Sequence, residues 1–88
     1  MACDELTYVG VDGSSWARVK ALVGGEYGIA IEADSGEASK RGVTLKWSYD
    51  LSEQTLAIQC LQKPFLIPCG TVNKRIDDAA ARCGIASG

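Results

Sequence analysis

Residues 43–60 read VTLKWSYDLSEQTLAIQC, and this stretch decides the fold. Apolar and polar residues alternate on both sides of a polar segment at 50–54, which is the pattern of a half-buried β-hairpin. One register aligns the apolar residues of both strands and pairs Tyr49 with Leu56, Trp47 with Ile58, and Leu45 with Cys60. A shift of one residue would turn this whole apolar set toward solvent, so we expect that register.

An amphipathic helix is expected on each side of this hairpin. Residues 14–23 carry apolar side chains at helical spacing, and the pattern stops at Gly24 and Gly25. A second apolar stripe runs from about 70 to 83 and stops at Gly84. Each stripe needs an apolar surface to cover, and the hairpin offers one.

The remaining segments are less regular. Residues 29–33 alternate apolar and polar, which predicts a further strand, and residues 34–42 are polar and predict a loop. Residues 1–12 could form a short edge strand or a loose arm, and residues 85–88 are expected to form a tail.

Together these elements predict one two-layer α+β domain over residues 1–88. Its order is helix, three-stranded antiparallel meander and helix, with both helices on the same apolar face of the sheet.

Composition narrows the class of protein. Hydrophobic residues make up 47% of the 88 residues and charged residues 23%, which is typical of a globular domain and not of a disordered chain. The net charge is −2, and the basic residues form no run that would displace counterions from phosphates. We therefore expect no nucleic-acid partner.

The sequence also predicts a location. No apolar stretch approaches the roughly 20 residues that a membrane helix needs, and the acidic start at residues 3–5 does not resemble a secretory signal. If the sequence is complete, we expect a soluble protein of the bacterial cytoplasm without a membrane partner.

The four cysteines at positions 3, 60, 69 and 83 do not form a zinc pattern. Structural zinc sites bring their ligands in close pairs, and here the nearest two cysteines, Cys60 and Cys69, are nine positions apart. We expect neither a metal nor another cofactor. Reduced thiols are favoured for a cytoplasmic protein, and a Cys60–Cys69 disulfide is the alternative.

Cys69 is the candidate for chemistry. It precedes the second expected helix, whose positive end would favour a thiolate. The chain contains no histidine, the usual partner of a nucleophilic thiol. A redox or nucleophilic activity at Cys69 is therefore the alternative, and a protein without catalytic activity is favoured.

The segment between Pro64 and Pro68 is the candidate for binding. Phe65, Leu66 and Ile67 are three consecutive apolar residues on a connection that the two prolines stiffen. They could cap the open end of the core, or they could form an exposed ridge for a partner.

Lys40 and Arg41 are further candidate binding residues, at the end of the polar segment 34–42. The sequence thus favours a small module that binds an unknown protein or small ligand, either as a monomer or as a homodimer. A homodimer that pairs through an edge strand is a further alternative.

Overall fold

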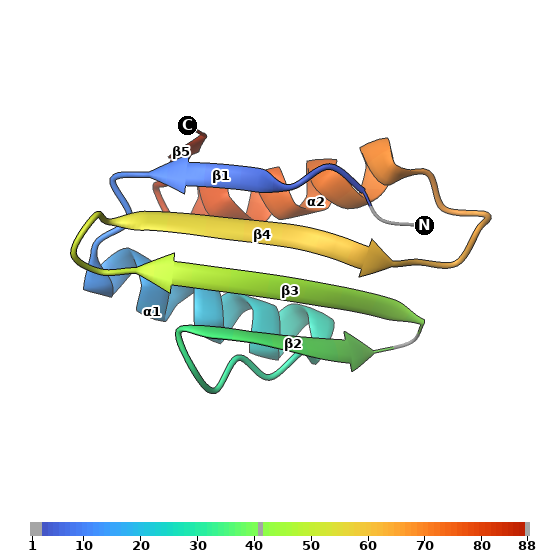
Figure 1. The fold of residues 1–88 in the computed structure, drawn as a ribbon, viewed down its shortest axis with the longest axis horizontal. Coiled ribbons are helices and arrows are strands. Elements are labelled where there is room, and N and C mark those ends of the chain that lie inside the picture. Colours follow the sequence, from blue (N-terminus) through green and yellow to red (C-terminus); the bar gives the residue numbers. More distant parts are fainter. Residues whose placement is uncertain (1–2, 41, 88) are drawn as a thin grey trace.

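A computed structural model describes residues 3–40 and 42–87, which form an antiparallel sheet with two helices on one face (Figure 1). The predicted two-layer α+β class is confirmed. The elements in chain order are β1 (Leu6–Val9), α1 (Gly13–Leu22), the π-helical turn η1 (Val23–Tyr27), β2 (Ser35–Lys40), β3 (Val43–Asp50), β4 (Thr55–Gln62), α2 (Cys69–Arg82) and β5 (Ala86–Ser87).

The β3–β4 hairpin forms in the predicted register. The structure pairs Leu45 with Cys60, Trp47 with Ile58, and Tyr49 with Leu56. Trp47 and Tyr49 are buried, whereas Ser48 between them is exposed on the opposite face. The indole of Trp47 donates a hydrogen bond of 2.9 Å to the carbonyl of Ala33, so its polar group is satisfied despite burial.

The predicted strand at 29–33 is wrong. Ile29 is buried and Ile31 is half-buried, so the alternation reflects burial, but this segment pairs with no other strand. The third strand of the meander is β2, which lies within the segment predicted to be a loop. β2 lies at one end of the sheet, where most of its residues are exposed. A polar sequence suits that position. Gly36 fits there because the Trp47 indole covers it, leaving little room for a side chain.

The two ends of the chain enter the sheet. The strand order is β2-β3-β4-β1-β5, and every neighbouring pair is antiparallel. β1 is therefore an inner strand and neither an edge strand nor a loose arm. The tail contributes Ile85 to the core and pairs as β5 with β1.

Both helices begin and end near the predicted positions. α1 begins earlier than expected, because the carboxylate of Asp12 accepts a 2.8 Å hydrogen bond from the backbone N–H of Ser15. It also does not stop at Gly24: the chain continues through η1 to Gly28, whose φ of 68° is the left-handed conformation that ends many helices. α2 follows Pro68 directly.

The two helices are fastened near opposite edges of the same face of the sheet (Figure 1). The rings of Trp16 on α1 and Tyr49 on β3 stack with centroids 5.0 Å apart. On the other side, the hydroxyl of Tyr8 on β1 donates a 2.6 Å hydrogen bond to Asp77 on α2. Burial and this carboxylate raise the pKa of Tyr8 well above its ordinary value, so the hydroxyl keeps its proton at neutral pH.

None of the helices in the described part of the chain is long and apolar enough to cross a membrane.

Candidate functional site

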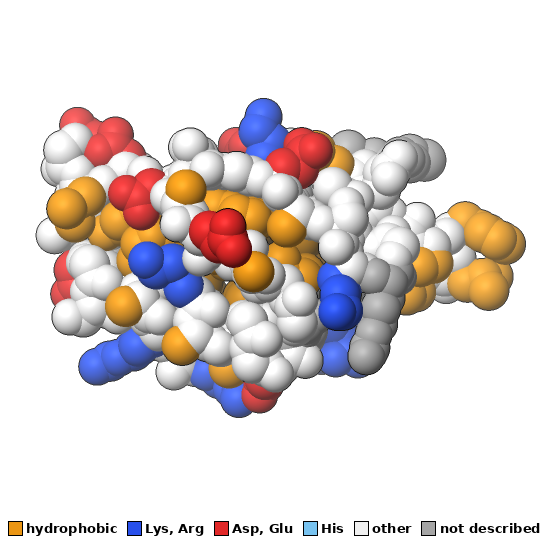
Figure 2. Space-filling view, turned by 90° about the horizontal axis from the view of Figure 1, so that it is seen from below, with side chains coloured by type: hydrophobic (Ala, Val, Ile, Leu, Met, Phe, Trp, Pro, Cys, Tyr) orange, Lys and Arg blue, Asp and Glu red, His pale blue; other side chains and the backbone are white. Residues whose placement is uncertain are grey.

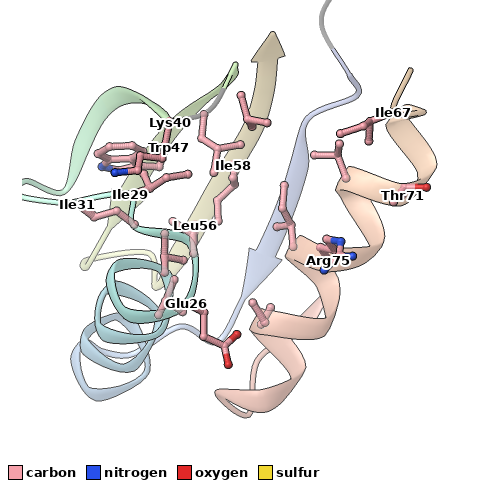
Figure 3. Close-up of a pocket in the computed structure, with 18 residues that line it drawn as sticks. Glu26, Ile29, Ile31, Lys40, Trp47, Leu56, Ile58, Ile67, Thr71 and Arg75 are labelled. Carbon is pink, nitrogen blue, oxygen red and sulfur yellow. The ribbon is translucent and has the colours of Figure 1, made fainter. Parts of the chain in front are cut away.

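An apolar cavity of about 270 Å³ lies between the two helices, beneath the sheet (Figure 3). β3 and β4 form its floor, α2 forms one wall, and α1, η1 and the segment after η1 form the other. The apolar floor residues include Leu45, Trp47, Leu56 and Ile58, and the walls include Val23, Ile29 and Ile31 on one side and Val72, Ile76 and Ala79 on the other.

The cavity exists because each helix is held at its own side of the sheet. Trp16 anchors α1 to β3, and Asp77 anchors α2 to β1, so the two helices stand apart on this face of the sheet and the cavity lies between them. The two helical segments meet through an ion pair instead. Arg82 of α2 donates to both carboxylate oxygens of Glu26 on η1, at 2.8 and 2.6 Å.

Among the residues that the structure describes, four with polar or charged side chains line this otherwise apolar cavity: Glu26, Lys40, Thr71 and Arg75 (Figure 3). Hydrogen bonding to Arg82 lowers the pKa of Glu26, so this carboxylate is ionised at neutral pH and its charge is compensated. Within residues 3–40 and 42–87, neither Lys40 nor Arg75 forms a salt bridge. The cavity therefore combines apolar walls with two cations that form no ion pair with any carboxylate among the described residues.

The π-helical turn helps to shape this site. It carries the chain past the expected helix end at Gly24 and adds Val23 and Glu26 to the wall of the cavity. After Gly28, the unpaired segment brings Ile29 and Ile31 to the same wall. Single π-helical turns are rare and occur frequently at functional sites.

The structure separates the residues predicted for binding. Ile67 and Lys40 both line the cavity, whereas Phe65 and Leu66 project from the loop between β4 and α2, with 87% and 79% of their surfaces exposed. Phe65 and Leu66 thus do not cap the core. Arg41 lies outside the described residues.

Figure 2 shows the surface of the molecule from the β2 side. Apolar side chains reach the surface near the middle of this face, between acidic and basic groups. The loop between β4 and α2 extends beyond the rest of the chain, and apolar side chains gather at its end.

Sequence reasoning did not find Arg75 or Glu26 as site residues. A single charged residue on an amphipathic helix resembles any solvated surface residue, so Arg75 carries no local signal. Its role follows from the space between α2 and the opposite wall, which only the tertiary structure defines.

Cys69 forms a disulfide with Cys3, across a sequence separation of 66. The prediction of a free thiol at Cys69 is therefore wrong, and so is the alternative Cys60–Cys69 bridge. Pairing becomes possible because the chain before β1 runs beside β4, where the backbone N–H of Cys3 donates a 2.8 Å hydrogen bond to Cys60. The disulfide thereby links the first residue of α2 to the segment that precedes β1.

Cys60 and Cys83 are buried free thiols, as expected for small core residues. Burial raises the pKa of both thiols, which disfavours the reactive thiolate. In the part of the chain that the structure describes, no three side chains of the metal-binding types come together.

The chain was compared with protein-family models, curated proteins and solved structures. None of them matches it. The assignment of function therefore depends on the geometry of the cavity and its surroundings.

The disulfide predicts how the cysteines behave in solution. Protein purified without reductant and then unfolded should expose two reactive thiols and have a mass lower by two hydrogens than the reduced chain. Reduction should lower the free energy of unfolding by about 2–5 kcal/mol, because the bridge closes a long loop in the unfolded chain. Urea denaturation with and without reductant measures this difference.

Two variants serve as controls. The double variant Cys3→Ser/Cys69→Ser should be insensitive to reductant, and Cys83→Ala should keep the sensitivity of the wild type. Four reactive thiols in the wild type, or equal stability with and without reductant, would contradict the assigned bridge.

Proposed function

We propose that this protein is a non-catalytic binding module that holds a small, largely apolar ligand in the cavity between η1 and α2. The observation that carries the proposal is an apolar cavity of about 270 Å³ in a chain of 88 residues. Small-molecule sites have this character: they are concave and mostly apolar, with a few polar groups that orient the ligand.

The energetics of a small domain support this proposal. A chain of this length buries a modest share of its surface on folding, so its stability depends on using its apolar residues fully. Atoms that line an empty space lose the contacts they would otherwise make. Ile58 and Ile76 line such a space. A bound apolar ligand would restore those contacts and stabilise the folded state.

The charged groups suit recognition better than proton transfer. A general acid or base works best with a pKa near the operating pH. The bond from Arg82 instead lowers the pKa of Glu26 and so moves it further from neutral pH. These groups can fix the orientation of a ligand without exchanging protons with it.

Two further predictions from the sequence stay proposals. A homodimer through an edge strand would use β2, which lies at one end of the sheet. The cytoplasmic location stays a prediction from the sequence. The Cys3–Cys69 disulfide argues against it, because such bonds persist mainly in oxidising compartments.

A second candidate function is contact with a second copy of this chain through the loop between β4 and α2. The exposure of the neighbouring side chains Phe65 and Leu66 favours it, since large apolar residues rarely project together without a partner. Pro64 and Pro68 flank them and limit the conformational entropy that binding would cost.

Binding of octan-1-ol tests the ligand-binding proposal. This neutral probe should bind with a dissociation constant on the order of 0.1–1 mM, because burial of its chain is offset by the cost of association. Ala79→Leu should weaken binding at least tenfold by occupying the cavity. Isothermal titration calorimetry measures both constants, and melting temperatures check that the variant folds.

Ala81→Leu is the matched control, because Ala81 is exposed on the same helix and does not line the cavity. It should bind octan-1-ol like the wild type. The proposal fails if the wild type does not bind the probe, or if Ala79→Leu folds and binds it as well as Ala81→Leu.

Leu66→Glu tests the second candidate. Sedimentation should show a concentration-dependent dimer for the wild type and a monomer for the variant. The melting temperature of dilute monomer should be unchanged, because Leu66 is exposed. A wild type that stays monomeric, or a variant that dimerises equally well, would exclude self-association through this loop.

A further inference from the structure

We propose that the ligand of this cavity is an amphipathic anion, with a carboxylate on an aliphatic or aromatic body, and that Arg75 holds the carboxylate. This inference deepens the proposed function and rests on it. It names the chemical class of the ligand, which the apolar walls alone leave open.

Arg75 is placed to meet an anion at the edge of the apolar space. It lines the cavity from α2 (Figure 3), directly before Ile76 and one helical turn before Ala79 in the same wall. Its guanidinium has no salt bridge within the described residues. The planar fork of N–H donors in arginine matches a carboxylate and can bind it through two parallel hydrogen bonds.

Lys40 supplies a second positive charge from another side of the cavity. Its stem lies over Gly28, where a Cβ placed on the glycine would be 3.4 Å from the Lys40 Cε. Lys40 thus stands beside the end of η1, next to the apolar segment that contains Ile29 and Ile31. It adds to the positive potential at the cavity without needing to touch the ligand.

The acidic groups nearby do not cancel this potential. Glu26 also lines the cavity, but Arg82 binds both of its carboxylate oxygens. Asp78 shares a shallow surface groove with Arg75, Arg82 and Glu26 and does not line the apolar cavity itself. Three cations thus stand against two carboxylates around the site, which favours an anionic over a cationic ligand.

The apolar walls require that this anion also carry a hydrophobic body. A small inorganic anion could not make use of the apolar side chains that line the cavity, such as Ile58 and Ile76. An aliphatic chain of medium length would cover them and would leave its charged end near Arg75. Burial of each methylene of the chain adds to the affinity and is offset by the cost of association.

The test compares three probes with the same eight-carbon chain: octanoate, octan-1-ol and octylamine. Each is titrated calorimetrically into the full chain at neutral pH and low salt. Octanoate should bind at least fivefold more tightly than octan-1-ol, and octylamine should bind more weakly than both. Arg75→Gln should weaken octanoate binding about fivefold more than it weakens octan-1-ol binding, because only the anion uses the guanidinium.

Lys74→Gln is the matched control. It removes the same charge from the adjacent exposed position of α2 but does not line the cavity, so octanoate affinity should stay near that of the wild type. Equal affinities for octanoate and octan-1-ol, or equal losses in Arg75→Gln and Lys74→Gln, would overturn the inference while the proposed function stands. If no probe binds, the proposed function fails and this inference fails with it.

Discussion

The antiparallel register of β3 and β4 is the constraint on which the rest of the structure depends. It places Trp47 opposite Ile58 and Tyr49 opposite Leu56, so one face of the sheet becomes continuously apolar. That face must be covered, and both helices pack on it. The opposite face carries polar residues such as Lys46 and stays in contact with solvent. Because side chains alternate between the faces of a strand, a slip of one residue would remove the core and the cavity floor together.

The cavity follows from how the helices are attached. Stacking of Trp16 on Tyr49 holds α1 at one side of the sheet, and the hydrogen bond from Tyr8 to Asp77 holds α2 at the other. The cavity lies between the two helices, where Leu56 and Ile58 of β4 line it. The cavity is apolar because the sheet and the helices line it with the same apolar faces that form the core. Charged side chains such as Arg75 line its edge. An amphipathic ligand fits this combination, since its two parts match the two kinds of surface.

The hairpin, both helices and the layering could be predicted from the sequence because each depends on a local apolar period. The strand at 35–40 could not, because it is polar and exposed, whereas 29–33 alternates like a strand but only lines the cavity. The bond between Cys3 and Cys69 joins residues far apart in sequence, and it depends on how the N-terminal arm docks beside β4. Arg75 is a site residue because it lines the cavity between the helices, and the position of that cavity depends on tertiary packing that no local sequence pattern predicts.

The central claim is that a small apolar molecule enters between the helices and reaches the sheet. Nuclear Overhauser effects between bound octan-1-ol and the methyl groups of the protein test it most directly. The account predicts contacts from the probe to Ile58 on β4 and to Ile76 on α2, which line the same cavity. Contacts to the exposed side chains of Leu51 or Leu66 without any to Ile58 and Ile76 would contradict it, because the probe would then bind the outer surface.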